Sequence, residues 1–177
     1  QSIAQYALIE PLGKGGMAEV YKARDTRLDR LVALKLVRRD LVHPDLLEEL
    51  RARFMREVRA LVRLDNHHIV RVYDAGEFEG MPYMVIEYLP GGTLKERLTT
   101  RALPWREAAA LLLPVAQGLA YAHGQGILHR DIKPGNILFD STGQPRIADF
   151  GIAKDLSGRE MTSLTATGFG IGTPEYM

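Results

Sequence analysis

The sequence contains no cysteine among its 177 residues. This absence excludes disulfide bonds, thiolate metal sites and thiol nucleophiles, and it fits a reducing compartment. No uninterrupted apolar run approaches the length that crosses a bilayer, and the opening residues QSIAQYALIEPLGKGG lack the order of a signal peptide. These absences predict a cytoplasmic protein.

The sequence also lacks an excess of charge of either sign. It has 23 basic and 22 acidic residues, which gives a formal net charge of +1. Because no global attraction to nucleic acid or anionic lipid follows from this balance, a basic nucleic-acid module is disfavoured and any anion must be bound by a local arrangement. An apolar fraction of 46% is that of an ordinary globular chain, here long enough for one sizeable core or two small lobes.

The first half of the chain predicts a small antiparallel sheet with one helix. Short segments rich in Val, Leu and Tyr are bounded by glycine or charged turns, which is typical of strands. The expected strands cover residues 6–12, 18–23, 31–37, 69–75 and 83–88. Between them, residues 44–64 carry an apolar stripe at helical spacing and predict one amphipathic helix.

The second half begins with a break at residues 89–92, LPGG, which we interpret as a hinge between two lobes. Residues 104–123 predict a helix that Pro114 should kink or widen. Short strands are expected at 137–139 and 145–148. The predicted organisation is a first lobe over residues 1–88 and an incomplete second lobe over residues 89–177.

A glycine-rich stretch, LGKGGMAEVY, lies between the first two strong strands. Gly13, Gly15 and Gly16 would let a hairpin approach a polyphosphate, with backbone N–H groups as donors. A flexible hairpin turn explains the same glycines equally well. Ala18 stands where the pattern G-x-G-x-x-G has its third glycine, and strands flank the stretch on both sides, so a dinucleotide-binding strand-to-helix turn is disfavoured.

The sequence VALK ends an apolar strand with Lys35. The lysine could extend along the sheet edge with its charge in water. Alternatively it pairs with Glu57, which lies among apolar neighbours on the expected helix, because buried cations need partners. That pair would hold the ammonium against nucleotide phosphates. Without it, Glu57 is a solvated helix charge.

The sequence ADFG places Asp149 directly after an apolar strand, followed by Phe150 and Gly151. An exposed turn would explain an acid close to a glycine. Together with Asn136, however, Asp149 supplies the oxygen ligands that Mg²⁺ prefers beside phosphate.

The stretch HRDIKPGN, residues 129–136, combines an acid, a base and an amide in one tight loop. Asp131 can accept the proton of a hydroxyl nucleophile, Lys133 can neutralise a transferring phosphoryl group, and Asn136 can bind a metal. A charged surface turn is the alternative for this stretch alone. Five such motifs in one order make accidental agreement improbable.

Taken in order, GKGGMAEV, VALK, Glu57, HRDIKPGN, DFG and GTPEYM resemble the motifs of protein kinases, and their wording is similar to bacterial eukaryotic-like (Hanks-type) serine/threonine kinases. The resemblance implies an α+β, bilobal protein-kinase-like fold with an N-lobe sheet, one N-lobe helix and a mainly helical C-lobe. It also implies ATP and Mg²⁺ or Mn²⁺ as cofactors, protein substrates, and transfer of the γ-phosphate to Ser or Thr hydroxyls.

Carried over position by position, the resemblance gives Asp131, Lys133, Asn136, Lys35 and Glu57 the catalytic roles. Asn136 and Asp149 would hold the metal. Nucleotide contacts would come from Leu12, Gly13, Gly15, Gly16, Val20, Ala33, Lys35, Ile86, Glu87, Leu89, Leu138 and Asp149. A hydrophobic spine would stack Leu61, Val72, His129 and Phe150.

The resemblance also implies regulation by phosphorylation. Arg130 would pair with a phosphorylated activation loop, in which Thr165 and Thr167 resemble an autophosphorylation site. A polar flexible loop is the alternative for either threonine. Thr173 would contact Asp131 and Lys133 and favour Ser or Thr substrates.

The sequence ends at Met177, before the segments that the resemblance would place next, so we expect a kinase domain cut before its end. Three hypotheses follow: an active kinase, a module that binds nucleotide without turnover, and an interaction module that uses the uncovered apolar face of the helix at 104–123. A homodimer through the N-lobe and a membrane anchor outside this chain are family properties that the residues leave open.

Overall fold

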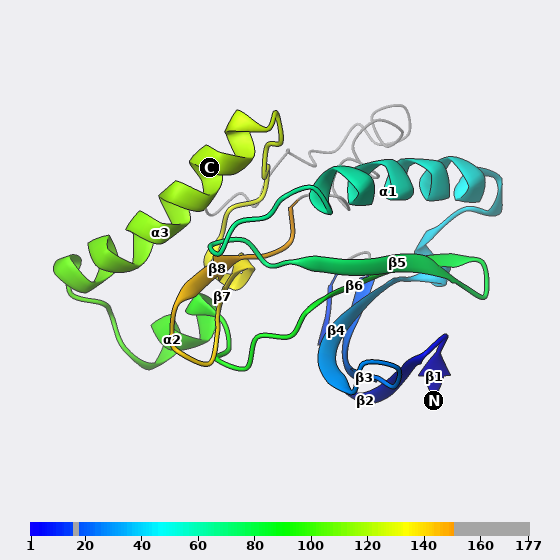
Figure 1. Ribbon diagram of the computed structural model, residues 1–177, viewed down its shortest axis with the longest axis horizontal. Helices are drawn as coiled ribbons and strands as arrows, with labels where there is room; N and C mark the ends of the chain where they lie inside the picture. Colours follow the sequence, from blue (N-terminus) through cyan, green and yellow to red (C-terminus); the bar gives the residue numbers. More distant parts are fainter. Residues whose placement is uncertain (16–17, 151–177) are drawn as a thin grey trace. The chain divides into compact units, whose positions relative to one another are not determined.

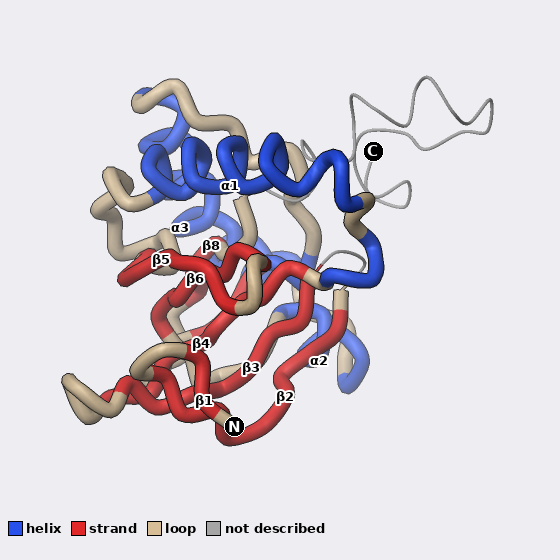
Figure 2. Tube along the Cα trace, turned by 90° about the vertical axis from the view of Figure 1, so that its right-hand side faces the viewer, coloured by secondary structure: helices blue, strands red, loops and turns tan. Residues whose placement is uncertain are grey.

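The computed structural model describes residues 1–15 and 18–150. The larger of its two sheets is antiparallel, with the strand order β1-β2-β3-β4-β6-β5 (Figures 1 and 2). The strands of this sheet are β1 Ser2–Ile3, β2 Tyr6–Lys14, β3 Ala18–Asp25, β4 Arg30–Val37, β5 Val72–Phe78 and β6 Met81–Glu87. The predicted sheet is therefore present, with β1 as an additional short edge strand.

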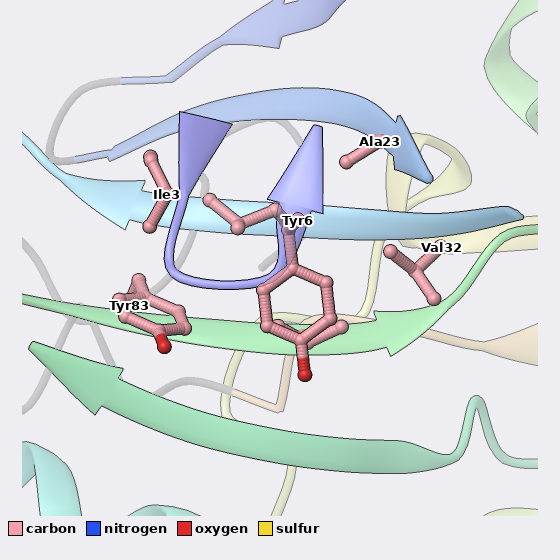
Figure 3. Close-up of a cluster of buried hydrophobic side chains, with 7 residues drawn as sticks. Ile3, Tyr6, Ala23, Val32 and Tyr83 are labelled. Atoms are coloured by element: carbon pink, nitrogen blue, oxygen red, sulfur yellow. The ribbon is translucent and has the colours of Figure 1, made fainter. Parts of the chain in front are cut away.

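A compact apolar cluster covers one face of this sheet. Val32 and Leu34 are two residues apart on β4, so both point to the same side of the sheet. The edge of the Tyr6 ring meets the Tyr83 ring, with centroids 6.2 Å apart. The buried members, several of which Figure 3 draws, are Ile3, Tyr6, Ala23, Val32, Leu34, Tyr83 and Val85.

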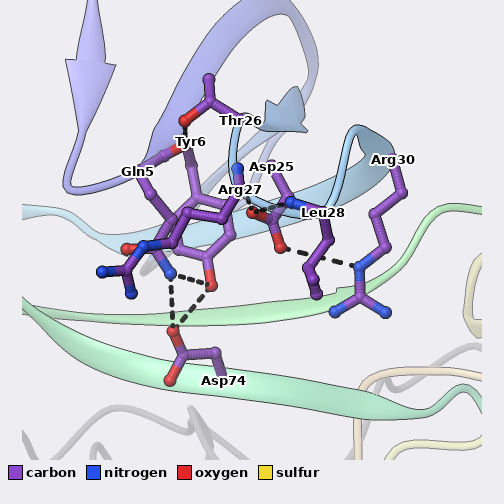
Figure 4. A network of polar contacts seen from close by, with 8 residues as sticks. All are labelled: Gln5, Tyr6, Asp25, Thr26, Arg27, Leu28, Arg30 and Asp74. Carbon is purple, nitrogen blue, oxygen red and sulfur yellow. Dashed lines mark hydrogen bonds and ion pairs between the residues drawn. The ribbon is translucent and has the colours of Figure 1, made fainter.

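A polar network lies beside the cluster (Figure 4). The Tyr6 hydroxyl donates to Oδ2 of Asp74 at 2.6 Å, and the Gln5 amide donates to the Tyr6 oxygen at 2.9 Å. Burial, followed by the bond to Asp74, raises the pKa of Tyr6 above its ordinary value. Asp25, which is buried, accepts from backbone N–H groups of the β3–β4 turn and lies 3.6 Å from Nε of Arg30.

Helix α1, Leu47–Leu61, packs against β5 and β6 (Figure 1). Its buried side chains recur at helical spacing, as the sequence predicted, and they are Leu50, Phe54, Val58 and Leu61. The predicted range of 44–64 was too long, because the chain enters α1 through a short 3₁₀ turn, Pro44–Leu46, after another at Arg39–Leu41.

A second group of elements contains α2 Leu94–Thr100, α3 Trp105–Gly124, a 3₁₀ turn at Pro134–Asn136, and the hairpin of β7 Ile137–Phe139 with β8 Pro145–Ile147. Helix α3 packs on β8, and α2 packs on β7. Helix α3 continues through Pro114 as one helix. Within the described ranges, no helix combines the length and the apolar character that spanning a membrane requires.

Helix α2 was not predicted from the sequence. Its start is nevertheless a complete capping box, in which the Thr93 hydroxyl accepts from the Glu96 N–H and the Glu96 carboxylate accepts from the Thr93 N–H at 2.6 Å. The pattern T-x-x-E at residues 93–96 was the available signal.

The chain divides into two compact units. Unit 1 is Gln1–Arg63 with Arg71–Tyr88, and unit 2 is Leu64–Val70 with the chain from Leu89 onward. The prediction grouped residues 1–88 together, whereas the structure assigns Leu64–Val70 to the second unit. The reason lies in backbone pairing, because Ile147 donates to the His68 carbonyl at 2.8 Å and accepts from the Val70 N–H at 2.9 Å.

Candidate functional site

The loop 129–136 in unit 2 brings three of the predicted catalytic side chains together. Nζ of Lys133 lies 2.9 Å from Oδ2 of Asp131, whose side chain is only 11% exposed. The Asn136 amide nitrogen donates to the Asp131 carbonyl at 2.8 Å and to its Oδ2 at 3.3 Å. The carboxylate of Asp131 is thus fixed by a cation and an amide that arise from the same short loop.

The buried side chain of His129 fixes this loop to the end of β8. The Asp131 N–H donates to Nδ1 of His129 at 3.2 Å, so Nε2 carries the proton and donates to the Ala148 carbonyl at 2.8 Å. Burial lowers the pKa of His129 below its ordinary value. A neutral ring is also the only form that both hydrogen bonds permit, since a protonated Nδ1 could not accept.

Residues 148–150 continue from β8 beside this histidine. The rings of His129 and Phe150 lie with centroids 4.6 Å apart, and the Ala148 N–H donates to the Asn136 carbonyl at 2.8 Å. Asp149 has a φ of +57°, in the left-handed region that Asp tolerates better than most side chains. The loop and the residues around Asp149 are therefore built as one hydrogen-bonded piece.

The donor chemistry around Asn136 and Asp149 fits a hard divalent cation. Because the amide nitrogen of Asn136 is turned to Asp131, its amide oxygen is the atom available as a ligand. Asp149 would add a carboxylate. Among the described residues no three His, Asp or Glu side chains form a metal cluster. Mg²⁺ bound with a nucleotide typically has one or two protein oxygen ligands, and phosphate and water oxygens complete its coordination.

In unit 1 the sheet places predicted nucleotide contacts on one face, opposite the apolar cluster. Lys35 pairs with Val20 on β3 and with Met84 on β6, and Ala33 pairs with Ile86. Since side chains two residues apart share a face, the lysine and these small or apolar side chains point to the same side.

Glu57 lies on α1 in the same unit. Its carboxylate is 3.5 Å from Nε of Arg53, one turn earlier on the helix. This contact was not predicted, although the spacing of four residues between Arg53 and Glu57 is a standard helical ion-pair signal. The pairing of Lys35 with Glu57 stays a prediction.

The glycine-rich hairpin joins β2 and β3. Gly13 pairs with Val20, and the Gly15 N–H donates to the Ala18 carbonyl at 2.9 Å. A Cβ added at Gly13 would meet no described atom within 4 Å, and one at Gly15 would only touch the Ala18 carbonyl. Packing within the described chain thus does not require glycine at either position.

The remaining predicted nucleotide contacts are divided between the units. Leu12 and Glu87 belong to unit 1, whereas Leu89 and Leu138 belong to unit 2. Of the spine residues, His129 and Phe150 are in contact as expected within unit 2, and Leu61 and Val72 lie in unit 1. Gly16, Thr165, Thr167 and Thr173 lie outside the described residues.

Comparison with known sequences agrees with these motifs. Residues 6–177 match the protein kinase domain family. The chain is 41% identical over 183 residues to the probable serine/threonine-protein kinase PknB of Bifidobacterium longum, and 41% identical over 174 residues to the serine/threonine-protein kinase PrkC of Bacillus subtilis. Each alignment covers 98% of this chain but only 26% of the relative.

Comparison with solved structures gives the same family. The crystal structure of the PknI kinase domain of Mycobacterium tuberculosis superposes with a TM-score of 0.75 at 34% sequence identity, covering 86% of this chain and 61% of that one. This chain belongs to the protein kinase family, and its α+β architecture is the protein kinase fold. Its similarity to named bacterial serine/threonine kinases confirms the resemblance that the motifs suggested.

Proposed function

We propose that this chain contains the ATP-binding and phosphoryl-transfer residues of a protein serine/threonine kinase of the bacterial Hanks type. The observation that carries the proposal is the preorganised loop of unit 2, in which Asp131 is fixed by Lys133 and Asn136 and joined through His129 to the end of β8. A merely charged surface turn would not bury an amide and an imidazole to orient one carboxylate.

Asp131 would accept the proton of a Ser or Thr hydroxyl and orient its oxygen toward the γ-phosphorus. Lys133, now 2.9 Å from that carboxylate, would neutralise charge on the phosphoryl group as it transfers. A carboxylate fixed before the substrate arrives does not have to be reorganised in the transition state, and this preorganisation is a major source of rate enhancement.

Asn136 and Asp149 would hold Mg²⁺, for which Mn²⁺ could substitute. The cation, when bound, neutralises the phosphate oxygens of ATP. The chain's own contribution is to keep the two ligands together, and the hydrogen bond from the Ala148 N–H to the Asn136 carbonyl supports that role.

In unit 1, Lys35 would contact the α- and β-phosphates while paired with Glu57, and Val20, Ala33 and Ile86 would contact the adenine from the same face of the sheet. The glycines of the β2–β3 hairpin, which packing alone does not require, would let the backbone approach the phosphates. Leu12, Glu87, Leu89 and Leu138 would complete the nucleotide contacts.

The finer assignments follow from family membership. We propose autophosphorylation on Thr165 or Thr167, a role for Thr173 in accepting Ser or Thr substrates, and location on the cytoplasmic side of the cell. A homodimer through unit 1 is an option for the intact protein. Protein substrates are proposed because the relatives are named serine/threonine-protein kinases.

The test is transfer from γ-labelled ATP by the intact protein to itself and to a generic Ser/Thr acceptor, with ATP affinity measured in parallel. Asp149→Asn should raise the Mg²⁺ concentration required for transfer and slow the reaction, whereas Asp45→Asn, at an exposed position before α1, should change neither. ATP binding without transfer would assign the chain to a non-catalytic nucleotide-binding module. The absence of both would refute the proposal.

A further inference from the structure

The side chain of Arg51 joins helix α1 to the turn between β5 and β6. Its Nε and Nη2 both donate to the Gly80 carbonyl, at 2.9 and 2.7 Å. The third guanidinium nitrogen, Nη1, donates to Glu48 at 2.6 Å, and Nε lies 3.5 Å from Oε2 of Glu77. One planar group therefore connects two positions on α1 with the end of β5 and the turn, all within unit 1.

The turn is shaped to receive this group. Gly80 has a φ of +79°, which a side chain would strain, and a Cβ added there would lie 2.7 Å from Nη2 of Arg51. Glycine at this position thus permits both the backbone conformation and the close approach of the guanidinium. A surface arginine whose charge was simply hydrated would not require a glycine at the facing position.

The contact lies on a short route to the proposed phosphate-binding lysine. Gly80 directly precedes β6, and Met84 of β6 pairs with Lys35 of β4. At the other end, Arg51 and Glu57 are six residues apart on the same helix, so a rigid α1 transfers the position of one to the other. Fixing Arg51 to the turn fixes α1 relative to the strands beside Lys35.

We propose that Arg51 is a positioning residue, which holds α1 against the β5–β6 turn so that Glu57 can pair with Lys35 when ATP is bound. The inference rests on the proposed function, because it concerns the Lys35–Glu57 pair of that same site. Without the Arg51 contacts the apolar side of α1 would still pack, but the helix would occupy a wider range of positions. The fraction of molecules with a correctly placed Glu57 would fall, and affinity for ATP would fall with that fraction.

The experiment compares Arg51→Met with Arg59→Met in the intact protein. Methionine keeps most of the apolar stem of arginine and removes its donors, and Arg59 is an exposed arginine on the same helix. We expect Arg51→Met to lower kcat/KM for ATP by about tenfold and to weaken ATP binding measured directly, since a fall in the competent fraction affects both. Arg59→Met should leave both unchanged. Arg51→Lys should be intermediate, because one ammonium can reach the Gly80 carbonyl but cannot replace the whole fork.

A double-mutant cycle separates positioning from general stability. If Arg51 acts through Glu57, Arg51→Met should have little further effect in a Glu57→Gln background, so the two effects should be strongly non-additive. Gly80→Ala, which disturbs the same contact from the other side, should show the same dependence on Glu57. Equal losses in both backgrounds, or a lower melting temperature with unchanged ATP affinity, would overturn the proposal.

The same measurements distinguish this inference from the proposed function. If the wild-type protein transfers no phosphate, the proposed function fails as catalysis, and the role of Arg51 is decided by ATP affinity alone. Affinity that Arg51→Met leaves unchanged would refute the positioning role whether or not the protein is a catalyst.

Discussion

Each of the two units contains a partly buried polar network, and the networks are built in opposite ways. In unit 1, Tyr6 on β2 donates to Asp74 on β5, which is 68 residues away in the chain. In unit 2, His129, Asp131, Lys133 and Asn136 contact one another within a single loop. The first network joins strands that lie far apart in the sequence, whereas the second gives a fixed shape to a segment that is largely without regular structure.

This difference indicates two separate roles for buried polar side chains. Hydrogen bonds between distant strands oppose unfolding, because they exist only when the whole sheet is assembled. Hydrogen bonds within a loop contribute little to assembly but determine where one carboxylate points. We therefore expect substitutions in the first network to change stability and substitutions in the second to change catalysis.

The largest effect is expected from Asp131→Asn. Removing the carboxylate that we propose as the acceptor of the hydroxyl proton should lower kcat by about 10²–10⁴-fold, because general-base catalysis contributes factors of this size. The free energy of unfolding should change little, since asparagine keeps the size and one oxygen of the side chain. Rapid-quench transfer assays and denaturant unfolding of the same preparation check both parts. Equal losses of activity and stability would remove the distinction between the two networks.

Tyr6→Phe should produce the opposite pattern. It removes the hydroxyl that bonds Asp74 and Gln5 while keeping the ring in the apolar cluster. A hydrogen bond to a charged group that is lost in this way should lower the free energy of unfolding by about 1–2 kcal/mol. Tyr21→Phe, which loses a bond to the nearby Glu19, is the matched control and should cost less. A marked fall in kcat of the folded Tyr6→Phe protein would contradict the comparison.

The pH dependence of stability should reveal His129. Because burial lowers its pKa in the folded state, the unfolded state binds a proton more readily as the pH falls below the ordinary value of 6.5. Its contribution to stability is therefore complete above pH 6.5 and is lost below it, with a slope of at most about 1.4 kcal/mol per pH unit. His129→Phe should flatten this slope, whatever its effect on stability at neutral pH.

Part of the slope should remain in that variant. The pKa of His68 is also lowered, first by burial and then by the neighbouring His67. An unchanged slope in His129→Phe would show that the imidazole does not distinguish the folded from the unfolded state.

The smallest effect is expected from Thr93→Ala, because the cap of α2 is formed by residues close in the sequence but lies outside the loop 129–136. Loss of an N-cap hydroxyl should cost about 1 kcal/mol of unfolding free energy. The control is Thr100→Ala, since the Thr100 hydroxyl bonds only within the last turn of the same helix. If kcat also fell in Thr93→Ala, a polar network formed by residues close in the sequence would not by itself indicate a role in catalysis.

The same contrast explains how much the sequence could predict. The loop 129–136 was recognised because its chemistry is contiguous, and the strand around Lys35 was recognised because it is a short run rich in Val and Leu next to a charged turn. Both predictions depend on neighbours in the sequence. The structure places Asp131, Lys133 and Asn136 together, as their spacing indicated.

Features that depend on distant pairing were not predicted. Tyr6 and Asp74 carry no mutual signal in the sequence, and neither do Arg51 and the Gly80 carbonyl. The place of Leu64–Val70 in unit 2 was not predicted for the same reason, because it depends on the backbone of Ile147. The cap of α2 is different, since the pattern T-x-x-E at residues 93–96 is a signal between neighbours in the sequence.

The hydrogen bonding of Leu64–Val70 with β8 has a consequence for folding during protein synthesis. The His68 carbonyl and the Val70 N–H leave the ribosome long before Ile147 does, so their hydrogen-bond partner does not yet exist when the sheet of unit 1 could begin to assemble. Each unit is built from two separate stretches of chain. A single cut after Tyr88 would therefore place Leu64–Val70 and its hydrogen-bond partner Ile147 in different fragments. The hydrogen bonds between this segment and β8 can therefore form only after the loop 129–136 and β8 have been synthesised.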